Sequence, residues 1–234
     1  MSRSLTPRRV LGIETSTAAA CSVALAEDGR VIASARLPAD ARPTARLVPA
    51  IGELCRGAGW SVRQLDLVCV DIGPGSYTGL RVGLTCAKAL AFATDAGLAT
   101  AESLAVVARN APANERLVEV AFDAARGQVF AARSARQGDN WLALAETRIL
   151  NANEWARSLD PAALVLGPAL TKYRSLISSP QRVADESDWS PRVERVIEIA
   201  LAQFQVEPLT SFWTLEPLYL RPSAAEEKLQ DRHP

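Results

Sequence analysis

The sequence predicts an α/β protein built from two similar halves, and three observations support this fold class. Each half opens with segments that alternate apolar and polar residues, as half-buried antiparallel strands do. Each half also contains a helical stripe and a continuous apolar segment, which is typical of a strand covered on both faces. The chain has 234 residues, of which 48% are hydrophobic and 22% charged, so it is long enough and apolar enough for two lobes.

The first three elements are predicted to form an antiparallel meander. The segment "RRVLGIETST" reads as a strand that ends in a hydroxyl-rich turn at residues 15–17. Residues 20–37 then alternate between two faces over two further strands. Between these strands, Asp28-Gly29 supplies the positive φ angles that a tight hairpin turn needs.

Two helices and a buried strand complete the first half. Residues 44–57 carry apolar side chains at helical spacing, and Pro43 suits the first turn of that helix. Pro49 lies inside the same pattern and predicts a kink or a late start. The strand at residues 67–71 is continuously apolar, and a helix rich in alanine and glycine follows it at residues 79–96.

A boundary between the halves is predicted near residue 105, where the short strand "LATA" and the helix "ESLAVVARNA" lead away from the first half. The N-terminal lobe is therefore expected at residues 1–105, the C-terminal lobe at 106–222 and a polar tail at 223–234. The end of the chain is expected to pack back on the first lobe.

The second half repeats the pattern of the first. Two strands flank a turn at residues 124–127, and "WLALAETRIL" is predicted as a third strand. The segment "AALVLGPAL" reads as a buried strand that ends in a Gly-Pro turn, and "SPRVERVIEIALAQFQ" reads as a helix.

Two strand-end turns carry residues suited to binding phosphate. These residues are Glu14, Thr15, Ser16, Thr17, Gly73, Gly75, Ser76 and Gly79. Ser76 or Thr78 is suited to cap the following helix, whose free N–H groups favour an anion. If the two turns face one another across a cleft, they bracket a polyphosphate, and Glu14 is placed to hold a hydrated divalent cation.

The same glycines also suit a packing turn that lets a helix touch a sheet. The phosphate-loop pattern G-x-x-x-x-G-K-[ST] is absent because no lysine stands in the turn. Both interpretations of the turn therefore stay open from the residues alone.

Composition argues against several classes of function. A formal net charge of zero gives no support to autonomous nucleic-acid binding. The single histidine, His233, leaves no helical histidine pair and no Cys/His cluster, so no metal is expected. The four cysteines are expected to be packed, reduced thiols, which favours a cytoplasmic location; they are Cys21, Cys55, Cys69 and Cys86. No apolar run is long enough to cross a bilayer, and "MSRSLTPRRV" lacks the apolar core of a secretory signal.

Four segments resemble the TsaB (YeaZ) family in their order and spacing. They are "LGIETSTAAACSVAL", "DIGPGSYTGLRVGL", "FDAARGQVF" and "PLYLRPSAAEEK", and together they extend over nearly the whole chain. The resemblance implies a two-lobed fold of the actin, Hsp70 and sugar-kinase type, each lobe a mixed sheet with helices.

The resemblance also implies a role in making threonylcarbamoyladenosine (t6A) at position 37 of tRNAs that read codons beginning with A. TsaB-like proteins act there as non-catalytic partners of the catalytic subunit TsaD, together with the ATPase TsaE, and meet tRNA indirectly. The resemblance implies no required cofactor beyond weak ATP or ADP binding. It also implies that the chain forms a homodimer when TsaD is missing.

The chain departs from the family at two positions. Glu14 stands where the family usually has aspartate, which weakens a metal-water role. Pro43 stands where the family often has a histidine, so no role of that histidine is carried over.

Two enzymatic alternatives stay open beside the scaffold. One is a small-molecule kinase in which Asp71 serves as the carboxylate, and the other is a glycoprotease-like peptidase. Glu14, Asp71 and Asp123 all end strands, where carboxylates more often act as caps or turn residues.

A partner surface is predicted on the helices 44–57 and 79–96, because apolar residues lie on more than one side of the second helix. The alternative is that both sides are core. The predicted interface residues are Leu47, Val48, Ile51, Leu54, Cys55, Leu80, Leu84, Ala87, Lys88 and Ala91.

Overall fold

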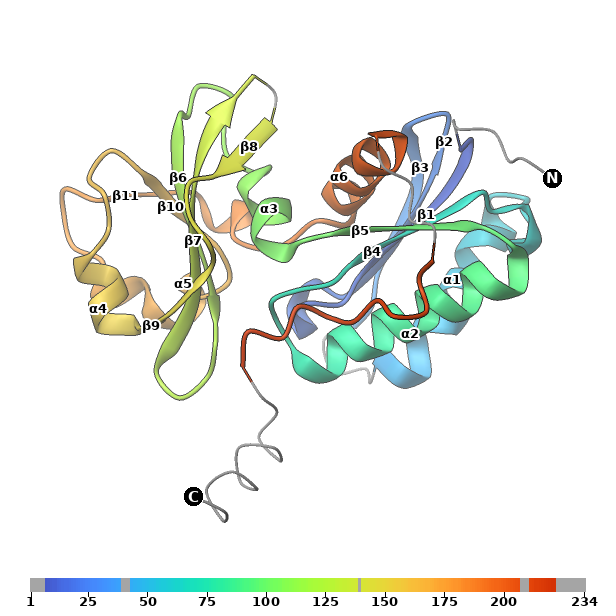
Figure 1. Ribbon diagram of the computed structural model, residues 1–234, viewed down its shortest axis with the longest axis horizontal. Helices are drawn as coiled ribbons and strands as arrows, with labels where there is room; N and C mark the ends of the chain where they lie inside the picture. The colour runs from blue at the N-terminus through green and yellow to red at the C-terminus, as the bar shows by residue number, and fades with distance from the viewer. Residues whose placement is uncertain (1–6, 39–42, 139, 207–210, 222–234) are drawn as a thin grey trace, which may run out of the picture.

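The computed structural model describes residues 7–38, 43–138, 140–206 and 211–221. Within these residues the chain forms two sheets that lie side by side (Figure 1), and the predicted two-lobed α/β class is confirmed. The predicted polar tail, with His233, lies outside the described residues.

The first sheet has five strands in the order β3-β2-β1-β4-β5. The strands are β1 (Arg9–Glu14), β2 (Ser22–Glu27), β3 (Arg30–Arg36), β4 (Leu67–Asp71) and β5 (Gly97–Ala101). β1, β2 and β3 form the predicted antiparallel meander, and β4 and β5 add in parallel beside β1.

The second sheet repeats this plan, with the order β11-β10-β6-β7-β8 and with β9 paired to β7. Its strands are β6 (Leu117–Asp123), β7 (Gln128–Gln137), β8 (Asn140–Ala143), β9 (Arg148–Asn151), β10 (Leu164–Leu166) and β11 (Arg182–Val183). The single third strand predicted from "WLALAETRIL" is instead two short strands, β8 and β9, which pair with different parts of β7.

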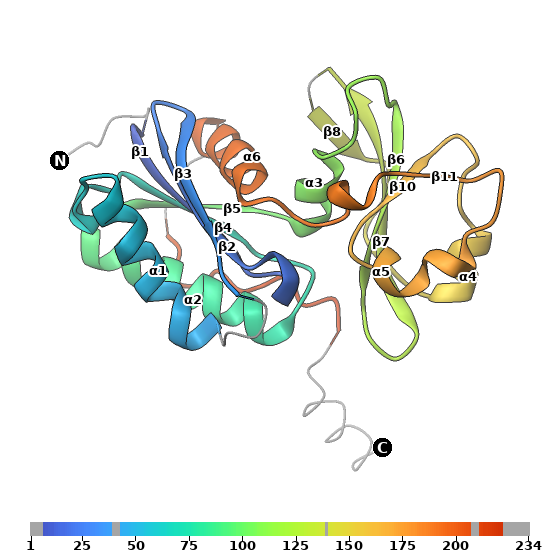
Figure 2. The ribbon, with the colours of Figure 1, turned by 180° about the vertical axis from the view of Figure 1, so that it is seen from behind.

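Helices cover the first sheet on both faces (Figures 1 and 2). The helices of the chain are α1 (Pro43–Gly57), α2 (Tyr77–Thr94), α3 (Ser103–Ala108), α4 (Ala152–Arg157), α5 (Leu170–Tyr173) and α6 (Val193–Val206). α1 and α2 pack on one face of the sheet, where they cover strand side chains such as Leu11, Val23 and Val68. Pro49 lies inside α1, which is continuous from Pro43 to Gly57, so the proline does not end the helix.

The other face of the first sheet is covered by α6, although α6 lies within the predicted C-terminal lobe at residues 106–222. Val193, Val196 and Ile197 pack there against Val10, Cys69 and other strand residues. Gly12 has no side chain because the side chain of Ile197 occupies that space. α6 packs on the first sheet because β1 and β4 are apolar on both faces, and α1 and α2 cover only one of these faces.

The cysteines are unpaired, as predicted. Cys21, Cys55 and Cys69 are buried, and burial raises the pKa of the Cys21 thiol to about 11. Along the described part of the chain, no helix has both the length and the apolar character needed to cross a bilayer.

Candidate functional site

The two predicted turns meet at the carboxyl ends of β1 and β4. These strands are parallel neighbours with Ile13 opposite Val70, so Glu14 and Asp71 follow side by side. In open α/β sheets the carboxyl ends of parallel strands are where ligands most often bind. The predicted carboxylates therefore lie where a site of this fold is expected.

The glycine turn packs directly against the first turn. The Ser76 N–H donates to the Ser16 carbonyl oxygen at 2.7 Å, and the Ser76 hydroxyl accepts from the Gly79 N–H at 3.2 Å, which caps α2. A β-carbon on Gly75 would lie 2.5 Å from the Ser16 carbonyl oxygen, and one on Gly79 would overlap the Thr15 carbonyl oxygen. The two turns thus touch instead of facing one another across a cleft, and these glycines serve a close approach of backbones.

The side chain of Thr15 extends the same contact along α2. A β-carbon on Gly83 would overlap the Thr15 hydroxyl oxygen, so this glycine too is required by the first turn. Thr17 caps a short 3-10 helix, Ala18–Ala20, by accepting from the Ala20 N–H at 3.2 Å. Nucleotide binding at these turns stays a prediction.

Glu14 and Asp71 are fully buried and each uses one oxygen to hold its own turn. Glu14 Oε1 accepts from the N–H and the hydroxyl of Ser16, both at 2.6 Å. Asp71 Oδ1 accepts from the Gly73 N–H at 2.7 Å and from the Ser103 hydroxyl at 2.6 Å. Both carboxylates therefore act as turn residues, whatever else they do.

The second oxygens of the two carboxyls, Glu14 Oε2 and Asp71 Oδ2, receive no hydrogen bond. Burial, reinforced by the charge of Asp71, raises the pKa of Glu14 well above its ordinary value of 4.5. Burial also raises the pKa of Asp71. A proton on one of the two carboxyls removes one of two buried like charges, whose coexistence is unfavourable.

Asp123 lies in the other lobe at the end of β6. Its Oδ1 accepts from the Ala125 N–H at 3.0 Å and from the Tyr173 hydroxyl at 3.2 Å. Ala125 and Arg126 have positive φ angles, so the predicted turn at residues 124–127 is a tight left-handed one. Asp123 is thus a turn residue, as the sequence favoured.

Most of the predicted interface residues lie in the core of the first lobe. Those that are buried there are Leu47, Ile51, Cys55, Leu80, Leu84, Ala87 and Ala91. All of them except Leu80 belong to the core cluster that α1 and α2 form with the sheet, which is the alternative that the sequence left open. Of the remaining three, Val48 has 61% of its surface exposed, and Leu54 and Lys88 are half-buried.

Sequence reasoning gave no structure to residues 211–221, which we call the C-terminal strap. The strap runs along α2 between the two lobes (Figure 1). Lys88 donates to the Trp213 carbonyl oxygen at 3.0 Å, and the Leu218 N–H donates to the Ile72 carbonyl oxygen at 2.7 Å. The expected return of the chain to the first lobe is therefore present in this segment.

The far end of the strap reaches the second lobe. The Arg81 guanidinium donates to the Tyr219 hydroxyl at 2.7 Å and lies 4.3 Å from the centre of the Tyr77 ring. Arg221 donates to the Ala124 carbonyl oxygen at 2.8 Å. Strap and α2 line an open pocket of about 770 Å³. The aromatic and basic residues of "PLYLR" are the signal that could have indicated this contact.

The described residues contain no group of three or more histidine, cysteine, aspartate or glutamate side chains placed to hold a metal ion.

Comparison with known proteins agrees with the geometry. Residues 38–173 match the family described as "TsaD: tRNA N6-adenosine threonylcarbamoyltransferase". The chain is 28% identical over 235 residues to the Escherichia coli protein named "tRNA threonylcarbamoyladenosine biosynthesis protein TsaB", covering 94% of this chain and 98% of that one. A Bacillus subtilis protein of the same name is 35% identical over 121 residues, about half of each chain. A solved structure titled "YeaZ from Pseudomonas aeruginosa" superimposes with a TM-score of 0.77 at 25% identity, over 91% of this chain and all of the other.

The repeated sheets and the paired strand-end turns define a two-lobed protein of the actin, Hsp70 and sugar-kinase type. Within that class, the chain belongs to the TsaB (YeaZ) family of TsaD-related proteins.

Proposed function

We propose that this protein is a non-catalytic partner subunit in the formation of t6A at position 37 of tRNAs that read codons beginning with A. It pairs with TsaD, which carries the catalysis, and works in the cytoplasm with the ATPase TsaE; tRNA is reached through the complex. The observation that carries the proposal is the near full-length similarity to a protein named for threonylcarbamoyladenosine biosynthesis.

The geometry of the site favours an accessory role for this protein and not a catalytic one. The glycine turn that would cradle a phosphate is already in contact with Ser16, and the N–H groups of Ser76 and Gly79 are used within the chain. Glu14 and Asp71 are buried and hold their own turns. Nucleotide is therefore proposed to bind weakly at most, and calorimetric titration with ATP and ADP, with and without Mg²⁺, measures this.

The docking face proposed for TsaD is the accessible side of α1, with Val48 at its centre. Val48→Asp places a charge on that side, and since the valine is exposed the fold should remain intact. We expect co-purification with TsaD of the same organism to fall at least tenfold. Cells in which Val48→Asp replaces the wild-type protein should then lose t6A, measured by mass spectrometry of their tRNA.

Val206→Asp is the matched control, because Val206 is 87% exposed at the end of α6, on the opposite face of the sheet. It should bind TsaD and restore t6A as the wild type does. Formation of t6A by the purified protein alone, with the activated donor and tRNA, would overturn the non-catalytic role. ATP turnover that Asp71→Asn abolishes would favour the kinase alternative.

A further inference from the structure

One of the two edges of the first sheet is formed by β3, and the other by β5. Among the described residues β3 pairs with β2 only, so its other side has backbone groups open to a partner. Proteins usually protect such an edge with charges, proline or a covering element. β3 carries Arg30 and Arg36 at its ends and a register shift at Ile32, yet two large apolar residues, Val31 and Ile32, have 41% and 47% of their surface exposed.

A groove of about 600 Å³ lies directly beside this edge, between β3 and α1. Its apolar lining comes from both elements and from the turn after α1, and includes Ile32, Ala35, Pro49, Leu54, Gly57 and Trp60. The volume is in the range of pockets that bind ligands. An edge with an apolar groove next to it is the arrangement by which some domains bind extended peptides as an added strand.

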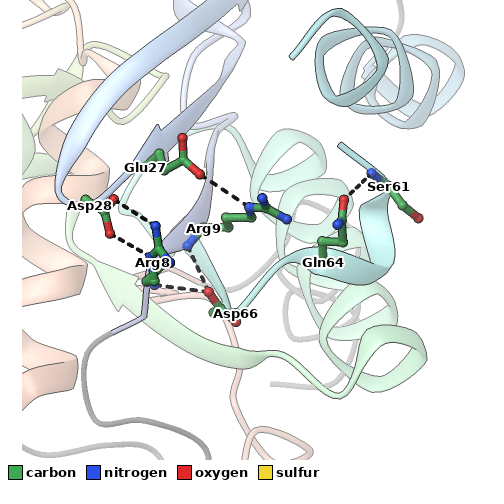
Figure 3. Close-up of polar contacts among 7 residues, drawn as sticks. All are labelled: Arg8, Arg9, Glu27, Asp28, Ser61, Gln64 and Asp66. Carbon is green, nitrogen blue, oxygen red and sulfur yellow. Dashed lines mark hydrogen bonds and ion pairs between the residues drawn. The ribbon is translucent and has the colours of Figure 1, made fainter. Parts of the chain in front are cut away.

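One end of the groove is fixed by a polar cluster (Figure 3). Glu27, which lines the groove, is paired with Arg9 at 3.4 Å, and the Arg9 guanidinium lies 5.2 Å from the centre of the Trp60 ring. Asp66 accepts from the backbone N–H groups of Arg8 and Arg9 at 3.0 and 2.9 Å, which anchors the start of β1 (Figure 3). This end of the groove is therefore preformed.

The charges along the groove indicate what it binds. Two arginines, Arg36 and Arg46, line the groove. Both are exposed, and neither forms an ion pair with any described residue. Glu53 lines it seven residues further along α1, about 10 Å away at 1.5 Å per residue. Three residues of an extended strand span the same ~10 Å. A complementary segment thus has an acidic residue, apolar residues, and a basic residue about three positions from the acidic one.

The symmetric full-length pairing of this edge with a second copy of the chain is disfavoured by charge. If two β3 strands paired antiparallel about Ala33, Arg30 of each copy would stand opposite Arg36 of the other. Like charges directly opposite in a sheet are destabilising.

We propose that this groove binds an extended segment of a partner protein, which adds a sixth strand beside β3. Its apolar side chains enter the groove, and its acidic residue meets Arg36 and Arg46. The groove lies on a different side of α1 from Val48, so this contact is separate from the proposed docking to TsaD.

Two glycines of α1 allow a matched test. A β-carbon on Gly57 or on Gly52 meets nothing within 4 Å, and neither glycine has a positive φ angle, so a larger residue is tolerated at both. Only Gly57 lines the groove. Gly57→Phe fills the groove, whereas Gly52→Phe adds the same side chain on another side of the helix.

The probe is a phage-displayed library of random 12-residue peptides, selected on the wild-type protein. We expect enriched peptides with an acidic residue beside apolar ones. The Kd of a synthesised hit should rise at least tenfold in Gly57→Phe and in Arg36→Glu/Arg46→Glu. It should stay unchanged in Gly52→Phe and in Arg56→Glu, an exposed arginine of α1 outside the groove. Circular dichroism and thermal melting verify that each variant is folded.

Three results would overturn the proposal: no enrichment, hits whose Kd is insensitive to Gly57→Phe, or a wild-type dimer that Gly57→Phe dissociates in light scattering. The last result would assign the groove to a second copy. Because Gly57→Phe should still co-purify with TsaD, failure here is distinguishable from failure of the proposed function.

Discussion

At the scale of single residues, the contact between Glu14 and Asp71 has a measurable dependence on pH. The folded protein keeps a proton on Glu14 above pH 4.5, where the unfolded chain releases it. The folded state therefore binds more protons in that range, and stability falls as pH rises through it. The stabilisation is complete only below the ordinary pKa of the glutamate.

Glu14→Gln is expected to remove the contribution of Glu14 to this dependence, because an amide of nearly the same shape carries no titrating proton. At pH 8 the variant should be more stable than the wild type by about 1 to 3 kcal/mol, and the difference should shrink toward pH 4.5. Urea unfolding at a series of pH values measures this. Glu146→Gln, an exposed carboxylate, is the control; a wild-type slope that equals the Glu14→Gln slope would rule out the proton on Glu14.

At the scale of elements, the close packing of α2 on the turn after β1 explains the positions of two glycines in that helix. The helix begins against the turn after β1, and Gly79 and Gly83 face that turn with no room for a side chain. Gly52 of α1 is also a helical glycine but has open space beside it.

We expect Gly79→Ala to lower the free energy of unfolding by about 1 to 3 kcal/mol, because the added methyl group overlaps the Thr15 carbonyl oxygen. Gly52→Ala should instead raise it by about 0.5 to 1 kcal/mol through backbone entropy. Chemical denaturation of the two variants compares them. If Gly79→Ala leaves stability unchanged and only reduces ATP binding, the turn is a phosphate site and not a packing contact.

Sequence pattern predicted most of these elements because the hairpin at Asp28-Gly29, the apolar strand at β4 and the helical stripes are local signals. It did not separate core from interface on α1 and α2. Leu47 and Ala87 follow the same spacing whether a sheet or another protein covers them, and here the sheet covers them. Nor did local pattern reveal that α6 covers the first sheet, since that contact joins residues far apart in the chain.

At the scale of the whole molecule, the C-terminal strap connects the lobes. Phe212 and Leu215 pack on the first core, whereas Leu220 packs on the second. Arg221 fixes the end of the strap to the β6–β7 turn through Ala124 and Gln128. A segment without regular structure therefore contacts the cores of both lobes.

Arg221→Ala should loosen this connection while leaving both cores intact. We expect faster hydrogen exchange at the Leu218 N–H and in the β6–β7 turn, by at least tenfold, with little change in β1 or β4. Arg116→Ala, an exposed arginine of the same lobe, should leave exchange at these sites unaltered. Unchanged protection in Arg221→Ala would show that the strap does not hold the lobes together.

The position of α6 has a consequence for synthesis on the ribosome. The strands of the first sheet are complete by Ala101, yet one of their faces stays bare until residues 193–206 have been translated. The nascent N-terminal portion must wait, with Val10 and Cys69 uncovered, while almost a hundred further residues emerge. Early chaperone attachment to that face is the expected cost of this chain order, and a gene cut between the halves should yield an insoluble first product.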